Sequence, residues 1–139
     1  MKITDLFEDS KYPYTWNEKN IIWDNGLFFI AVNNTSNPTY FTIWTDENKK
    51  IGVLALSPIT KKQEKWMKVD TVDIDSKYRG NGLGVEVYRQ ALNVLPDDVK
   101  GIYSYLPNRS NTKQVPKIYK KLGGYVKDGD HAFLPKPKV

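Results

Sequence analysis

Cysteine is absent from the 139-residue chain, and histidine occurs once, as His131. Without cysteine the chain has no disulfides, no thiol nucleophiles and no thiolate ligands for metals. A zinc site built around one histidine would consist mainly of carboxylates, so we expect no metal centre. No apolar run approaches the roughly 20 residues that span a bilayer, and no apolar stretch of a signal peptide follows Met1–Asp5. We therefore expect a soluble, cytoplasmic protein that is not bound to a membrane.

The net charge of +5 is unevenly distributed along the chain. The segment from Thr112 to Val139 holds seven lysines against Asp128 and Asp130, so it carries the whole net charge. Such a basic segment suits a polyanionic partner, either a phosphorylated cofactor or nucleic acid. A solvated lysine-rich surface without a partner explains it equally well.

Length and composition favour one compact domain over residues 1–139, since hydrophobic residues make up 40% and charged residues 27%. Residues 1–25 are polar and aromatic without a clear period, so we expect an irregular arm there, with a short helical turn at Thr4–Glu8. Hydrophobic runs and alternation predict strands over residues 26–32, 39–45, 51–56, 66–74, 101–106, 125–126 and 131–134.

Two segments have helical spacing instead. Apolar residues recur every three or four positions from Gly84 to Leu95, where Pro96 ends the run, and again from Val115 to Leu122, where Gly123 and Gly124 close it. The order strands, helix, strand, helix, strands predicts an α/β or α+β fold. We expect a mixed, mostly antiparallel central sheet of about six to seven strands, flanked by helices.

A glycine-rich loop follows the fourth predicted strand and opens the first helix, with the sequence Arg79, Gly80, Asn81, Gly82, Leu83 and Gly84. The first amides of a helix have no intrahelical partner and bind anions, and glycines let a phosphate approach the backbone. The loop lacks the Gly-Lys-Ser/Thr of a P-loop. It also comes too late, and with the wrong glycine spacing, for a dinucleotide fingerprint. A tight turn without a ligand is the alternative.

Two motifs resemble those of the GNAT superfamily of N-acetyltransferases. The first is the run from Ile74 to Gly84, in which a strand ends in an apolar residue and Arg/Gln-x-x-Gly-x-Gly/Ala follows. The second, similar to the family's C-terminal "lYeklGF" element, is Ile118-Tyr119-Lys120-Lys121-Leu122-Gly123-Gly124-Tyr125. The two motifs stand in the family's order, and the resemblance covers about residues 51–125. It implies a GNAT-like fold and acetyl-CoA as co-substrate.

The resemblance also implies roles for individual residues. Backbone groups of Val72 and Ile74 would pair with the pantetheine arm, where the fourth and fifth strands splay apart. Amides of the loop from Arg79 to Gly84 would hold the pyrophosphate. The Tyr119 hydroxyl would protonate the departing CoA thiolate, although its place in an apolar helical stripe also suits a structural role. Thr112 stands where many relatives have an asparagine, seven residues before the tyrosine.

The chain departs from the family pattern in the part that binds the acceptor. Relatives usually have two helices between the first and second strands, whereas a short turn, Asn33–Pro38, joins the two runs here. The general base is also open. Asp70 and Asp73 lie on the fourth strand with opposite orientations, and Asp73 is preferred because it lies closer to the expected acyl position. His131 is an alternative base.

We therefore expect an acetyl-CoA-dependent N-acetyltransferase that transfers the acetyl group directly to an amine of a small molecule or protein. The alternative is a catalytically silent binding or structural module with the same fold. Compact chains of this kind resemble products of tailed bacteriophages, which would place the protein in the host cytoplasm or in a virion. Nucleic-acid binding through the lysine-rich C-terminal segment is a third, less favoured hypothesis, and it predicts a steep salt dependence.

Overall fold

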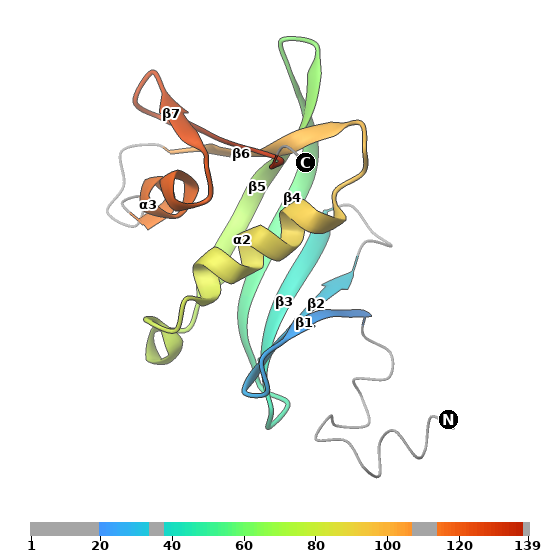
Figure 1. The fold of residues 1–139 in the computed structure, drawn as a ribbon, viewed down its shortest axis with the longest axis vertical. Coiled ribbons are helices and arrows are strands. Elements are labelled where there is room, and N and C mark those ends of the chain that lie inside the picture. The colour runs from blue at the N-terminus through green and yellow to red at the C-terminus, as the bar shows by residue number, and fades with distance from the viewer. Residues whose placement is uncertain (1–19, 34–37, 107–113, 138–139) are drawn as a thin grey trace.

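A computed structural model describes residues 20–33, 38–106 and 114–137 (Figure 1). The predicted helical turn at Thr4–Glu8, most of the aromatic arm and Thr112 lie outside these residues. The described strands are β1 (Asn20–Asp24), β2 (Phe28–Asn33), β3 (Thr39–Thr45), β4 (Lys50–Lys61), β5 (Glu64–Ile74), β6 (Val99–Tyr105), β7 (Tyr125–Lys127) and β8 (His131–Pro135). The helices are η2 (Ser76–Tyr78), α2 (Leu83–Val94) and α3 (Gln114–Lys121).

The eight strands form one sheet in the order β1-β2-β3-β4-β5-β6-β8-β7. Every neighbouring pair is antiparallel except β5 and β6, which are parallel. The predicted mixed, mostly antiparallel sheet is therefore confirmed. The strands before α2 are joined as successive antiparallel neighbours, with no helix between them in the described chain.

Two segments differ from the sequence prediction by more than two residues at an end. The end of the expected irregular arm is strand β1, which pairs with β2 from Asn20↔Val32 to Asp24↔Phe29 and raises the strand count to eight. Its residues follow a polar and aromatic segment without a clear period, and only the pairing with β2 marks them as a strand. Strand β4 extends five residues beyond the predicted end at Leu56, through Pro58. Pairing of β4 with β3 ends at Leu56, so beyond this point β4 needs donors only toward β5, and Pro58 is tolerated.

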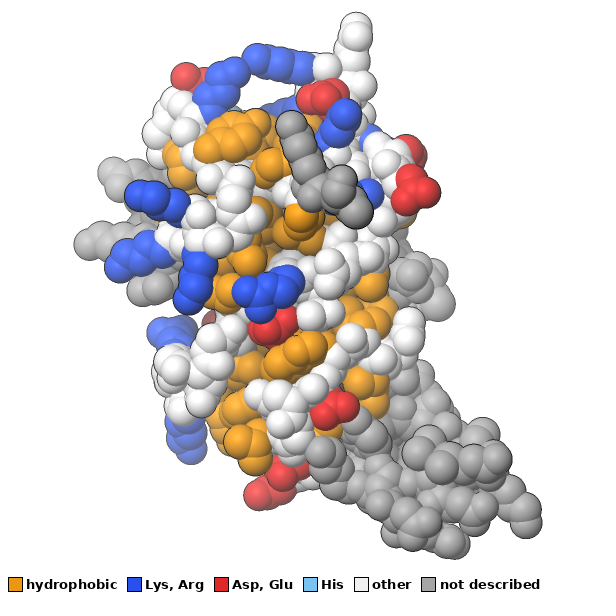
Figure 2. Space-filling view, in the orientation of Figure 1, with side chains coloured by type: hydrophobic (Ala, Val, Ile, Leu, Met, Phe, Trp, Pro, Cys, Tyr) orange, Lys and Arg blue, Asp and Glu red, His pale blue; other side chains and the backbone are white. Residues whose placement is uncertain are grey.

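Helix α2 crosses one face of the sheet, and α3 lies beside the end of β8 and β7 (Figure 1). The buried side chains of α2 recur at the predicted three- and four-residue spacing: Leu83, Val87, Tyr88, Ala91 and Leu92. They pack with inward residues of the central strands in one core. Figure 2 shows hydrophobic side chains along the middle of this face. None of the helices in the described part of the chain is long and apolar enough to cross a membrane.

Candidate functional site

Strands β5 and β6 separate partway along β5. Their parallel pairing runs through Lys65↔Val99 and Met67↔Ile102 and ends at Lys68↔Tyr103. Beyond this pair β6 continues beside β8, while β5 continues to Ile74 beside β4 alone. A bulge between β4 and β5 lies at the same place and makes Asp70 the additional residue. The second half of β5 therefore has one backbone edge that β6 does not pair.

The alternation of β5 decides which backbone groups face this edge. The Asp75 amide donates to the Ile51 carbonyl of β4 at 2.8 Å. Alternate residues of a strand direct their backbone groups to opposite sides, so those of Val72 and Ile74 face away from β4. The Ile74 carbonyl there accepts a hydrogen bond from Arg79 Nε at 3.2 Å. Both predicted backbone positions thus lie along the unpaired edge.

The glycine loop lies where β5 ends. Gly80 and Gly82 have φ of 89° and 72°, a left-handed conformation that favours glycine. A Cβ added to either residue would meet no atom within 4 Å. Glycine is therefore required at these two positions by the backbone conformation, and not by a close contact. The space next to both residues is open to a ligand. Asn81 closes the loop by donating its side-chain amide to the Tyr78 carbonyl at 2.8 Å.

The start of α2 presents unpaired amides to this loop. The first helical hydrogen bond joins the Glu86 amide to the Gly82 carbonyl at 3.0 Å, and Gly82 supplies no side-chain cap. The amides of Leu83, Gly84 and Val85 precede that bond and meet no acceptor among the described residues. Together with the exposed Arg79 side chain, they form a site suited to a phosphate group.

Tyr119 lies at the other end of the unpaired edge. Its hydroxyl is 2.9 Å from Ser104 Oγ, and Ser104 directly follows Tyr103, the last β6 residue paired with β5. The Tyr119 side chain is fully buried. Burial raises the pKa of Tyr119 well above its ordinary value, and the neighbouring Tyr88 adds to the rise. The hydroxyl consequently keeps its proton at neutral pH and remains a hydrogen-bond donor.

Tyr88 brings a third hydroxyl to the same place from α2. Its ring meets that of Tyr119 edge to face, with the centroids 5.3 Å apart. Its hydroxyl lies near those of Tyr119 and Ser104, yet it makes no hydrogen bond of normal geometry with any described residue. Burial raises the pKa of Tyr88 to about 12. The sequence analysis missed Ser104 and Tyr88, although a serine among inward apolar residues of β6 is a usable signal.

The two candidate carboxylates occupy different parts of β5. Asp70 lies two residues beyond Lys68, or about 7 Å along the strand, and Asp73 lies five residues beyond it, or about 16 Å. Asp70 accepts a hydrogen bond from Ser57, and its other oxygen is 3.7 Å from Lys68 Nζ. Asp73 lines an open pocket of about 300 Å³ with Lys50, Gly52 and Asp75. The sheet places Asp70 nearer to the strand separation.

His131 belongs to a different cluster, on the sheet face away from α2. Its Nδ1 is 2.5 Å from the Tyr103 hydroxyl and its Nε2 is 3.3 Å from Asp130. No group of three or more potential metal ligands occurs in the described ranges. His131 is thus held by its hydrogen bond with Tyr103, a residue of the last β5–β6 pair.

Comparison with solved structures identifies the same fold elsewhere. AtaTR bound with AcCoA matches with a TM-score of 0.57 and 19% identity, over 71% of this chain and 68% of that chain. Arabidopsis thaliana Naa50 in complex with the bisubstrate analogue CoA-Ac-MVNAL matches with a TM-score of 0.52 and 15% identity, over 72% of each chain. A chimera of spermidine N-acetyltransferase SpeG from Vibrio cholerae and hSSAT gives 0.56 and 12%, over 74% and 69%. At these identities the likeness establishes the fold alone.

No curated protein matches the chain in sequence. The model of the acetyltransferase (GNAT) family, however, matches residues 3–124. This range includes the separated strands, the glycine loop and the Tyr119 segment. Because the match extends over most of the 139 residues, the chain belongs to the acetyltransferase (GNAT) family.

Proposed function

We propose that the chain is an acetyl-CoA-dependent N-acetyltransferase that transfers the acetyl group directly to an amine. The observation that carries this proposal is the arrangement along β5. An unpaired backbone edge joins the glycine loop, where the first amides of α2 have no acceptor among the described residues, to the Tyr119 hydroxyl at the other end. Structural neighbours solved with AcCoA or a CoA-containing analogue support acetyl-CoA as the co-substrate.

The chain's residues fit the parts of acetyl-CoA in order. The amides of the loop from Arg79 to Gly84 would receive the pyrophosphate, because those at the start of α2 have no other acceptor among the described residues. Val72 and Ile74 would offer backbone hydrogen bonds to the pantetheine amides, as a neighbouring strand would. The Ile74 carbonyl can do so only if Arg79 Nε no longer donates its hydrogen bond to it. Thr112 as a further cofactor contact stays a prediction.

Tyr119 is the proposed acid. When bound, the thioester supplies an activated acetyl group whose departing sulfur needs a proton. A tyrosine whose pKa is raised by burial keeps its proton until the leaving group demands it. Ser104 would orient the hydroxyl, because the two oxygens are 2.9 Å apart.

The amine must lose a proton before it attacks, and a carboxylate of β5 is the proposed base. Asp73 is the predicted residue. Asp70 is added here, because it lies closer to the strand separation and is already hydrogen-bonded to Ser57. The variants Asp70→Asn and Asp73→Asn separate the two, since only loss of the base should lower kcat without weakening acetyl-CoA binding.

The acceptor class is an amine of a small molecule or of a protein. Structural neighbours include a spermidine N-acetyltransferase chimera and a complex with a peptide-containing bisubstrate analogue, which makes both classes reasonable. A catalytically silent module is the second candidate. The absence of helices between the strands that precede α2, within the described ranges, favours it. A bacteriophage source, and with it a location in the host cytoplasm or a virion, stays a prediction from the sequence.

Acetyl-CoA binding and turnover test the proposal separately. Millimolar acetyl-CoA should raise the melting temperature, because it binds the native state alone. Formation of free CoA with an amine panel should then distinguish the enzyme from the silent module. A chain with no thermal shift refutes the enzyme and any module that depends on the cofactor, and a shift without transfer to any amine supports the silent module.

A further inference from the structure

The sheet face away from α2 carries a continuous group of aromatic side chains. The register sets Tyr103, Phe133 and Tyr125 side by side, and Tyr105 beside His131. Their rings contact one another, and Trp66 meets Phe133 with the ring centroids 5.1 Å apart. We call this set the aromatic row: Trp66, Tyr103, Tyr105, Tyr125, His131 and Phe133. Tyr105 and Tyr125 are more than half exposed, so the row is open to a ligand at its outer members.

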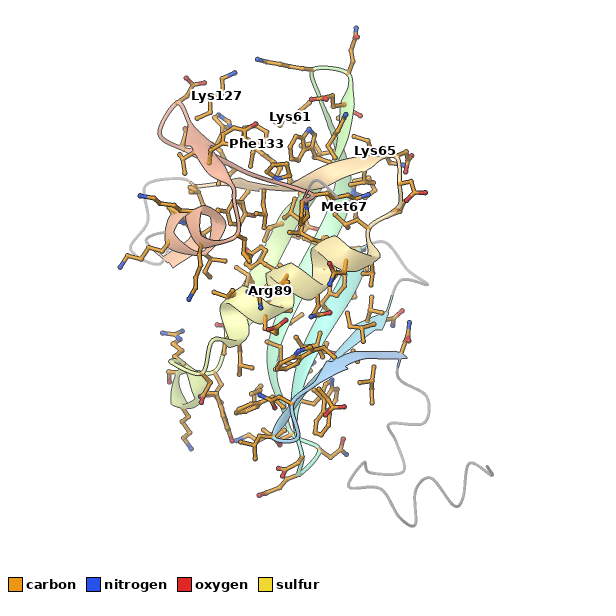
Figure 3. All side chains as sticks on the ribbon, viewed as in Figure 1. Lys61, Lys65, Met67, Arg89, Lys127 and Phe133 are labelled. Carbon is orange, nitrogen blue, oxygen red and sulfur yellow. The ribbon has the colours of Figure 1, made fainter. Side chains whose placement is uncertain are left out.

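Three lysines converge at one end of this row. Lys61 Nζ lies 4.4 Å from the centre of the Tyr103 ring. Lys62 is the next residue, in the turn of the β4–β5 hairpin, and the side chain of Lys127 on β7 lies against the side chain of Lys62. Contact with the Lys127 side chain and repulsion between the two ammonium groups lower the pKa of Lys62, and Asp128 offsets this in part. Figure 3 shows Lys61, Lys127 and Phe133 close together in the upper part of the view.

These lysines lack the partners that neighbouring charges have. Ion pairs join Lys65 to Asp98, Lys68 to Asp70 and Lys100 to Glu64, while Asp130 contacts His131. No carboxylate within ion-pair distance of Lys61, Lys62 or Lys127 occurs in the described ranges. Lys61 lies over the Tyr103 ring, and none of the three lysines has a carboxylate at ion-pair distance in the described ranges, so together they favour an anion.

The backbone at Lys62 adds an independent indication. Lys62 and Gln63 form the two-residue turn of the hairpin with φ of 49° and 68°. Such turns favour asparagine and glycine, and other residues are strained there. Strained backbone positions occur most often at functional sites, so the turn that carries Lys62 is a candidate part of one.

The location of the lysines links them to the transfer reaction. Tyr103 is the last β6 residue paired with β5, and Ser104, the partner of Tyr119, follows it directly. Because successive side chains of a strand point to opposite faces, an anion held by Lys61 above the Tyr103 ring would lie on the face away from Tyr119, next to the place where β5 and β6 separate. The amine of the same molecule would then have to reach the acetyl group through this separation between the two strands.

We propose that the amine acceptor carries a negatively charged group, phosphate or carboxylate, which Lys61, Lys62 and Lys127 bind beside the aromatic row. This inference rests on the proposed acetyltransferase function and specifies its substrate class. A purely cationic acceptor such as a polyamine would be repelled by the same lysines.

Three amines that share a ring and differ in charge test the proposal on the full chain: tyramine, tyrosine and tyramine phosphate. Binding to the CoA-saturated protein is measured by calorimetry, and acetylation by release of CoA. We expect one of the two anionic amines to bind about 10- to 100-fold more tightly than tyramine, the range for a hydrogen bond to a charged group. If tyramine phosphate binds more tightly, the bound group is a phosphate, and if tyrosine does, it is a carboxylate.

Lys61→Met should remove most of this preference, and Lys61→Arg should restore it. Lys65→Met is the matched control, because Lys65 belongs to the same hairpin but pairs with Asp98. Displacement of tyramine phosphate by a single-stranded oligonucleotide would assign the phosphate to a nucleic acid, and lack of displacement would assign it to a small molecule. Equal binding of all three amines, binding of none, or an unchanged preference in Lys61→Met overturns the inference. If acetyl-CoA still raises the melting temperature in that case, the proposed function survives.

Discussion

Two isosteric substitutions, Tyr119→Phe and Tyr88→Phe, should differ in their effect on stability: only the first should destabilise the fold. Both rings are fully buried and in edge-to-face contact, and each variant removes one hydroxyl oxygen. The difference lies in the hydrogen bonds. The Tyr119 hydroxyl is bonded to Ser104, whereas the Tyr88 hydroxyl has no partner of normal geometry among the described residues.

The expected sizes follow from that difference. Tyr119→Phe leaves the Ser104 hydroxyl buried without its partner, which costs about 1–3 kcal/mol of unfolding free energy. Tyr88→Phe removes a polar group that lost its water on folding without gaining a bond, so it should be neutral or stabilise by about 1 kcal/mol. The contact between the rings is retained in both variants, because phenylalanine keeps the ring.

Urea denaturation of the three proteins measures both changes, with equal m-values as the control for a changed unfolded state. The activity assay adds a second difference. Tyr119→Phe should lower kcat by about 10²- to 10⁴-fold if the hydroxyl is the acid, and Tyr88→Phe should not. Equal destabilisation of the two variants would refute the hydrogen-bond assignment. A Tyr119→Phe enzyme with unchanged kcat would remove Tyr119 from the chemistry.

The other predictions concern the glycine loop, the turn between β4 and β5, the pH dependence of stability, and the close contact of Gly124 with β8. Gly82→Ala should cost about 1 kcal/mol of stability, because φ is 72°, and should reduce the thermal shift with acetyl-CoA; an undiminished shift would place the pyrophosphate elsewhere. Replacing Lys62 and Gln63 by Asn and Gly should stabilise the hairpin by about 1 kcal/mol in urea denaturation, and no gain would show that the turn is unstrained. Tyr88 has its pKa raised to about 12, so the folded chain keeps a proton that the unfolded chain loses near pH 10. Stability should therefore fall by about 3 kcal/mol between pH 10 and 12, and Tyr88→Phe should show a smaller fall. Gly124→Ala should strongly destabilise α3 against β8, because the added Cβ would lie 2.5 Å from the Phe133 carbonyl oxygen; circular dichroism during heating tests this, and an unchanged melting temperature contradicts it.

Much of this architecture could be predicted from local patterns. Strand β3 has the bounds that its run of apolar and β-branched residues indicated, and α2 has the predicted apolar stripe, which ends before Pro96. The Gly80 and Gly82 turn, followed by a helix, was also visible, because glycine and helix-start signals depend on neighbours in the chain. Strand β1 was missed, since its stability depends on pairing with β2, which the sequence of residues 20–24 does not reveal.

The sequence by itself indicated the fold class and the glycine turn before a helix, because periodicity and turn signals depend on residues close together in the chain. Tyr119 became a candidate acid through the resemblance of its segment to the GNAT motif. Only the tertiary structure decided which groups meet. It joined Ser104 to Tyr119, set Tyr88 beside them without a partner, and brought Lys127 against the β4–β5 hairpin. The contact between Ser104 and Tyr119 lies at the place where β5 and β6 separate. That place is set by the pairing of whole strands, and no local spacing of residues encodes it.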